Sequence, residues 1–193
     1  MFGRLLFEVK EMKKNILICG EKGVGKSTLI RCLLDAADLR QGGFYTKKEF
    51  CANQPLHPVY IYSSDLPEAR RSRGAENLVG RCDESGCREI YPAVFNTLGV
   101  SCLENTTGKQ VIVMDELGFM ESSSYAFCQA VLKALDGDIP VLAAVKAGCD
   151  VEFLLNVRSH PQAEVVQITP ENREELYHLL LPVVRGWKVQ STM

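Results

Sequence analysis

A segment near the N-terminus has the residue types and spacing needed to bind phosphate groups. It fits the pattern G-x-x-x-x-G-K-[ST], in which glycines let successive backbone N–H groups turn inward toward phosphate oxygens. Lys26 is predicted to hold the β- and γ-phosphates of a nucleotide, and the Ser27 hydroxyl is predicted to ligate Mg²⁺. The predicted nucleotide-binding residues are Gly20, Glu21, Lys22, Gly23, Val24, Gly25, Lys26, Ser27 and Thr28.

A second candidate segment carries two acidic residues at the end of an aliphatic run. Residues 111–114 read Val-Ile-Val-Met and are followed by Asp115 and Glu116. Carboxylates at the carboxyl end of a strand near a phosphate-binding loop can reach the metal and the γ-phosphate. Asp115 is therefore a predicted Mg²⁺ ligand, and Glu116 is the candidate that positions or deprotonates the attacking water.

Phosphoryl transfer often uses an arginine to neutralise charge that gathers on the γ-phosphoryl group. Arg81, Arg158 and Arg173 are the candidates in this sequence, and Arg81 ranks first. The alternative for each of them is a structural or solvent-exposed side chain.

Short aliphatic runs and helical patterns alternate along the chain. Strands are expected at residues 15–19, 111–114, 141–145 and 165–168, and a helix at residues 26–39. A second helix is expected through Phe127 and Leu135 behind a capping serine run, and a last helix with Thr169 as N-cap and Pro170 at its first position. This alternation predicts an α/β fold, with a doubly wound, mostly parallel sheet and helices on both faces.

The middle of the chain has a different character. Residues 44–51 and 59–62 are expected to form a strand pair around a turn, whereas the charged segment 67–89 is expected to be an exposed loop or lid. Cys82 and Cys87 could supply two thiolates to zinc, with Cys51 and His57 as partners, but a second closely spaced cysteine pair is missing. Incidental cysteines in a loop are the preferred interpretation.

The composition narrows the functional class. The 193 residues suffice for one substantial domain, and the net charge of −2 supplies no overall basic field for a nucleic-acid backbone. No apolar stretch is long enough to span a membrane, and the N-terminus is charged too early for a signal peptide. We expect a cytoplasmic protein that binds neither membranes nor nucleic acid, with its eight cysteines mostly reduced.

Five segments are informative together: the phosphate-binding loop, Gly43-Phe44-Tyr45-Thr46, Leu78-Val79-Gly80-Arg81, Asp115-Glu116-Leu117-Gly118-Phe119-Met120-Glu121 and Thr169-Pro170-Glu171-Asn172-Arg173. They resemble the THEP1-like nucleoside-triphosphatases, in that family's order and over nearly the whole chain. The resemblance implies a RecA-like P-loop fold and slow, Mg²⁺-dependent hydrolysis of several nucleoside triphosphates with little base preference. It also makes residues 12–193 the P-loop domain and residues 1–11 an extension for which disorder is expected. The segment after Arg81 departs from the family pattern.

Two other functional classes stay open at the level of sequence. A nucleotide or small-molecule kinase also uses a P-loop but must exclude water, and no arginine-rich lid matches that class. A nucleotide-dependent switch would bind a triphosphate and act on a partner without catalysis. The sequence leaves the preferred base, the physiological substrate and the oligomeric state undetermined.

Overall fold

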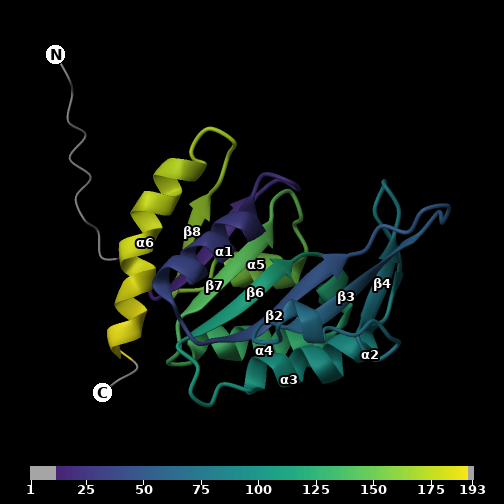
Figure 1. The fold of residues 1–193 in the computed structure, drawn as a ribbon, viewed down its shortest axis with the longest axis horizontal. Helices are drawn as coiled ribbons and strands as arrows, with labels where there is room; N and C mark the ends of the chain where they lie inside the picture. Colours follow the sequence, from purple (N-terminus) through teal and green to yellow (C-terminus); the bar gives the residue numbers. More distant parts are fainter. Residues whose placement is uncertain (1–11, 191–193) are drawn as a thin grey trace.

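The computed structural model describes residues 12–190, so the expected extension at residues 1–11 lies outside the described residues. In chain order the strands are β1 (Asn15–Gly20), β2 (Gln41–Lys48), β3 (His57–Ser63), β4 (Leu78–Cys82), β5 (Cys87–Ile90), β6 (Val111–Leu117), β7 (Val141–Lys146) and β8 (Ala163–Gln167). They form one eight-stranded sheet in the order β5-β4-β3-β2-β6-β7-β1-β8 (Figure 1).

Five neighbouring strands of this sheet run parallel. β1 pairs with β7 and β8, while β6 pairs with β7 and β2. Every residue of β1 is buried, as expected of an aliphatic strand covered on both faces. The predicted mostly parallel α/β sheet is therefore confirmed, and the carboxyl ends of β1, β6 and β7 lie at one edge.

Helices cover both faces of the sheet (Figure 1). On one face, α1 (Lys26–Ala37) and α6 (Arg173–Gln190) pack over an apolar cluster that includes Ile18 and Val113. The helices of the other face pack over a second apolar cluster. They are α2 (Pro92–Val94), a π-helical turn (Phe95–Gly99), α3 (Val100–Glu104), α4 (Tyr125–Asp136) and α5 (Glu152–Arg158).

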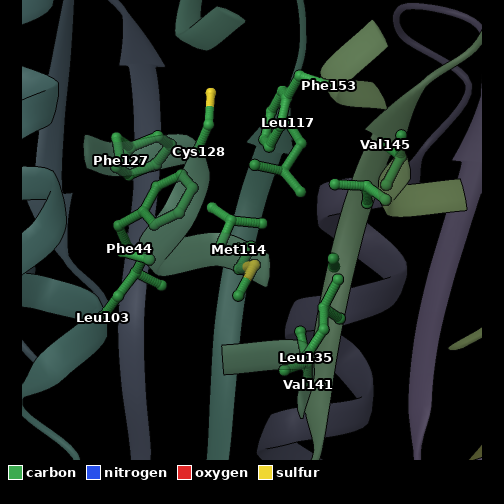
Figure 2. Packing of buried hydrophobic residues seen from close by; sticks show 14 of the residues in the cluster. Phe44, Leu103, Met114, Leu117, Phe127, Cys128, Leu135, Val141, Val145 and Phe153 are labelled. Carbon is green, nitrogen blue, oxygen red and sulfur yellow. The ribbon is translucent and has the colours of Figure 1, made fainter. Parts of the chain in front are cut away.

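Aromatic packing in the second cluster fixes the strands that lead to the site (Figure 2). Phe44 of β2 meets Phe127 of α4 edge to face, with ring centroids 5.2 Å apart. Met114 and Leu117 of β6 belong to the same cluster and are fully buried. Such close-packed interiors resist displacement, so the chain that follows β6 is held in a defined place.

The remaining strands form an antiparallel extension of the sheet. β3 pairs with β2, β4 with β3, and β5 with β4. The strand pair expected at residues 44–51 and 59–62 is confirmed as β2 and β3. The expectation of a loop or lid over residues 67–89 is wrong for its second half, because β4 and β5 form a hairpin there.

Charge pairing explains why this segment forms a hairpin although its charged composition is typical of an exposed loop. Arg81 lies 3.4 Å from Glu89, and Arg88 lies 2.6 Å from Asp83, so the charges of the segment neutralise one another across the hairpin. Val79 is fully buried and anchors β4 to the core. A strand at a sheet edge can carry many charges because one of its faces and its outer border meet water.

One expected helix cap and one expected helix start differ from the observed ones. α4 begins directly behind the serine run and the 3₁₀ turn (Met120–Ser123), as expected, but the Ser124 side chain makes no capping bond. The last helix begins at Arg173 rather than near Pro170. Asn172 organises this entry: its side-chain oxygen accepts a hydrogen bond from the Thr169 N–H at 2.8 Å, and its amide donates to the Gln167 carbonyl at 2.9 Å.

Across residues 12–190, none of the helices has both the length and the apolar character required to cross a membrane.

Candidate functional site

The predicted phosphate-binding loop connects β1 to α1. Gly23 and Gly25 adopt positive φ angles of 79° and 106°, which other residues reach only with strain. A Cβ on Gly20 would come within 2.7 Å of Ile168, so this position also requires glycine. Because α1 has twelve residues and begins at Lys26, its N-terminal N–H groups and its dipole face the loop and favour an anion there.

The other predicted residues of the loop have contrasting exposure. Glu21, Lys22 and Gly23 are exposed, and Val24 is buried against the core. Ser27 and Thr28 lie in the first turn of α1 and are exposed. The loop therefore has an apolar anchor and a solvent-accessible rim.

Lys26 is held at the mouth of this loop. Its side chain is 4% exposed, and its ammonium group donates hydrogen bonds of 2.8 Å to the carbonyls of Gly20 and Glu21. The same nitrogen lies 3.1 Å from Oε1 of Glu116. Three oxygens thus fix a single positive charge between the loop and the end of β6.

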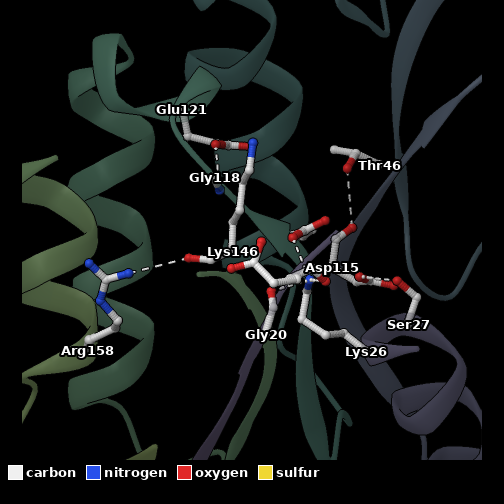
Figure 3. A network of polar contacts seen from close by, with 11 residues as sticks. Gly20, Lys26, Ser27, Thr46, Asp115, Gly118, Glu121, Lys146 and Arg158 are labelled. Carbon is white, nitrogen blue, oxygen red and sulfur yellow. Dashed lines mark hydrogen bonds and ion pairs between the residues drawn. The ribbon is translucent and has the colours of Figure 1, made fainter. Parts of the chain in front are cut away.

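Ser27 and Asp115 meet across the gap between α1 and β6. The Ser27 hydroxyl donates a 2.8 Å hydrogen bond to Oδ1 of Asp115 (Figure 3). Burial raises the pKa of Asp115 to about 6, and the Ser27 hydrogen bond opposes that rise. A hydroxyl and a half-buried carboxylate side by side suit a hard divalent cation, which would compensate the negative charge of Asp115.

Glu116 lies beside this pair at the border of a cavity of about 240 Å³. Its side chain is 33% exposed. Oε1 is buried and makes no aligned hydrogen bond to any group in residues 12–190, although it forms the ion pair with Lys26. Ser27 and Asp115 line the same cavity, so the structure brings the predicted metal-binding and water-activating side chains together.

The three candidate arginines lie in different places. Arg81 pairs with Glu89 on the β4–β5 hairpin, and the structure does not bring it to the phosphate-binding loop. Arg158 donates hydrogen bonds to the carbonyls of Lys146 and Cys149, which places it as a support for the chain after β7. Arg173 packs on the loop itself, because a Cβ on Gly25 would lie 3.4 Å from its Nε.

Sequence reasoning assigned no role in the site to four ionisable residues that line the cavity: Lys48, Asp83, Glu121 and Lys146. Lys146 ends β7 directly after an aliphatic run, which is the signal that pointed to Asp115 after β6. Glu121 lies in the loop beyond Glu116, and its side chain is 3% exposed. Burial raises the pKa of Glu121 to about 7, opposed by the hydrogen bond from the Gly118 N–H and by the charge of Lys146.

The cysteine pair considered for zinc forms part of the cavity wall. Cys82 and Cys87 face each other across the β4–β5 hairpin and line the cavity. Burial, together with the neighbouring Cys87 thiol, raises the pKa of Cys82 to about 12. Within residues 12–190, no three histidine, cysteine, aspartate or glutamate side chains are grouped so that they could hold a metal ion.

Comparison with curated proteins and solved structures gives a consistent set of relatives. The nucleoside-triphosphatase THEP1 of Thermotoga petrophila is 31% identical over 179 residues, covering 88% of this chain and 92% of the relative. The human cancer-related nucleoside-triphosphatase is 28% identical over 195 residues, covering 90% and 96%.

The fold of the chain is likewise similar to two solved structures. The crystal structure of THEP1 from Aquifex aeolicus matches with a TM-score of 0.68 at 23% identity, covering 88% of this chain and 98% of that one. The solution structure of the human cancer-related enzyme matches with a TM-score of 0.63 at 23% identity, covering 89% and 97%. The family model described as NTPase matches residues 15–181, and the chain therefore belongs to this family of THEP1-like nucleoside-triphosphatases.

Proposed function

We propose that this protein hydrolyses nucleoside triphosphates to nucleoside diphosphates and phosphate in a reaction that requires Mg²⁺. The observation that carries the proposal is the meeting of two pairs at one edge of the sheet. Ser27 contacts Asp115 at 2.8 Å, and Lys26 contacts Glu116 at 3.1 Å. Membership of the nucleoside-triphosphatase family supports the reaction class.

The phosphate-binding loop supplies most of the binding energy in this proposal. The N–H groups of residues 20–28 surround the phosphate oxygens, and Lys26 moves its charge from the loop carbonyls to the β- and γ-phosphates. Because Lys26 is nearly buried, its charge is weakly screened and acts strongly on the phosphate. Ser27 and Asp115 would hold Mg²⁺, which neutralises charge on the phosphate oxygens when it is bound.

Glu116 acts on the attacking water. Its side chain is 33% exposed at the border of the cavity, and movement of Lys26 to the phosphates would free Oε1 to accept a hydrogen bond from water. The water oxygen bonds to the γ-phosphorus as the bond from that phosphorus to the β–γ bridging oxygen breaks. The water proton passes to Glu116 or to the phosphate product, and the leaving diphosphate keeps the bridging oxygen.

We propose little selectivity for the base, because all the contacts named here go to phosphates, metal and water. ATP, GTP, CTP and UTP should therefore be hydrolysed at rates within about tenfold of one another, which corresponds to about 1.4 kcal/mol in transition-state free energy.

The decisive experiment measures phosphate release from the four nucleotides with and without Mg²⁺ and with no acceptor present. Lys26→Ala should abolish tight nucleotide binding and turnover, whereas Glu116→Gln should keep binding and lose turnover by about 100-fold or more. Glu89→Gln on the hairpin is the matched control for loss of a carboxylate. Nucleotide binding without phosphate release in the wild type would contradict hydrolysis and favour a kinase or a nucleotide switch.

A further inference from the structure

Lys146 lies between the two strands that lead to the proposed phosphate-binding and catalytic residues. It ends β7, which lies between β1 and β6 in the sheet. Lys146 is the register partner of Gly20, and the Ala147 N–H donates a 3.2 Å hydrogen bond to the Gly20 carbonyl. The backbone of Lys146 is therefore fixed directly beside the start of the phosphate-binding loop.

The side chain of Lys146 is held by the loop that follows Glu116. Its ammonium nitrogen lies 5.6 Å from the centroid of the Phe119 ring, and the side chain extends toward Glu121 (Figure 3). The Glu121 carboxylate is buried and accepts a 2.9 Å hydrogen bond from the Gly118 N–H. A ring face and a buried carboxylate thus direct one positive charge across the wall of the cavity.

Hydrolysis needs a cation where charge develops; Lys26 is assigned to phosphate binding, and Arg173 packs on Gly25 of the loop rather than lining the cavity. Besides Lys146, the cationic side chains that line the cavity are Lys22 in the exposed loop and Lys48, which donates to the Asp83 carbonyl at the hairpin. Arg158 is occupied by the carbonyls and the carboxylate of the chain after β7. Lys146 lines the same cavity as Glu116, and its backbone lies beside the start of the phosphate-binding loop.

We propose that Lys146 is a further catalytic residue, which stabilises negative charge on the γ-phosphoryl group in the transition state, and that Glu121 is the positioning residue that orients it. This inference rests on the proposed hydrolysis. A lysine fixed in advance near developing charge stabilises the transition state more than the ground state, because its orientation requires no rearrangement during reaction. The opposing explanation is that Lys146 only neutralises a buried carboxylate.

The test compares kcat and nucleotide affinity in four variants and one control variant. Lys146→Met keeps the aliphatic stem and should lower kcat by about 100-fold, while affinity for a fluorescent ATP analogue with a β–γ imido bridge changes less than about threefold. Lys146→Arg should restore kcat to within about tenfold of wild type. Lys133→Ala, at an exposed lysine on α4, is the control and should match wild type.

The Glu121 variants separate positioning from simple charge neutralisation. Glu121→Gln should lower kcat by about tenfold at unchanged affinity, and the double variant Lys146→Met/Glu121→Gln should be no slower than Lys146→Met alone. The double variant also contains no unpaired charge at this position, so it tests the role of Lys146 even if the single Lys146 variant folds poorly. Recovery of turnover in the double variant toward wild type would show a structural pair and overturn the proposal.

Failure of this inference is distinguishable from failure of the proposed function. Wild-type phosphate release is measured first, and its absence contradicts hydrolysis itself. If the wild type hydrolyses ATP and Lys146→Met retains kcat within about threefold, hydrolysis stands and the catalytic role of Lys146 is rejected.

Discussion

The parallel and antiparallel parts of the sheet carry charge in opposite ways. In the parallel part, charged residues appear where buried strands end, as at Asp115 and Lys146, and they converge on one cavity. In the antiparallel β4–β5 hairpin, charges lie along the strands and pair with one another, as Arg81 does with Glu89. A charge that interrupts an aliphatic run is therefore more informative about chemistry than a charge among many others.

The largest effect that tests this comparison concerns two aspartates that line the same cavity from different parts of the sheet. Asp115→Asn should lower Mg²⁺-dependent turnover by about 1,000-fold, because it removes a proposed metal ligand at the end of β6. Asp83→Asn in the hairpin should leave turnover within about threefold of wild type. The measurement is phosphate release across a Mg²⁺ titration. Equal losses of turnover in the two variants would contradict the proposed difference between the parallel and antiparallel parts of the sheet.

A substitution in the parallel part should also lower the free energy of unfolding more than a substitution in the hairpin. Leu142 in β7 is fully buried, and Leu142→Ala should lower the free energy of unfolding by about 2–5 kcal/mol because it leaves a cavity. Arg88→Ala removes an exposed ion pair with Asp83 and should cost less than about 1 kcal/mol. Urea unfolding of both variants checks this, and a larger loss from Arg88→Ala would show that the hairpin stabilises the core.

The pH dependence of stability should contain a contribution from Glu121. Burial raises the pKa of Glu121 from 4.5 to about 7, so the folded protein binds an extra proton between these values. Stability should therefore fall as pH rises from about 4.5 to 7 and remain lower above that range. Glu121→Gln should raise the free energy of unfolding at pH 8 by on the order of 1–3 kcal/mol and have little effect below pH 4.5.

Urea unfolding at several pH values measures this effect, with Glu89→Gln on the hairpin as the carboxylate control. If Glu121→Gln destabilises the protein equally at every pH, the loss comes from packing or hydrogen bonding rather than from ionisation.

The smallest expected effect concerns Arg81, which the sequence placed first among the candidate arginines. Because Arg81 pairs with Glu89 on the hairpin, Arg81→Ala should change turnover by less than about threefold. Steady-state phosphate release measures it. A loss of turnover of tenfold or more would show that Arg81 acts in the candidate site, which would require the hairpin to move during catalysis.

The sequence was sufficient for the features that rest on local physical rules. The glycines of the phosphate-binding loop and the aliphatic residues of β1, β6 and β7 predict both the fold and the edge where Lys26, Ser27, Asp115 and Glu116 meet. These predictions succeed because burial on both faces leaves an uninterrupted apolar pattern.

The features that sequence reasoning missed depend on contacts between distant segments. The hairpin at residues 78–90 is stabilised by pairing with β3 and by burial of Val79 and Gly80, so its charged composition is misleading. Glu121 becomes a buried carboxyl group only because the chain after β6 folds back over the cavity. Asn172, rather than Thr169, organises the start of α6 through bonds to both sides of the turn.

The position of β1 between β7 and β8 has a consequence for the synthesis of this protein. Its neighbours in the sheet are β7 and β8, and the buried side chain of Asn15 bonds to the Leu135 carbonyl and the Val141 N–H, 120 and 126 residues further along the chain. Among the described strands, β1 is synthesised first, yet its partners β7 and β8 are the last two to be made. Contacts over such long separations form slowly.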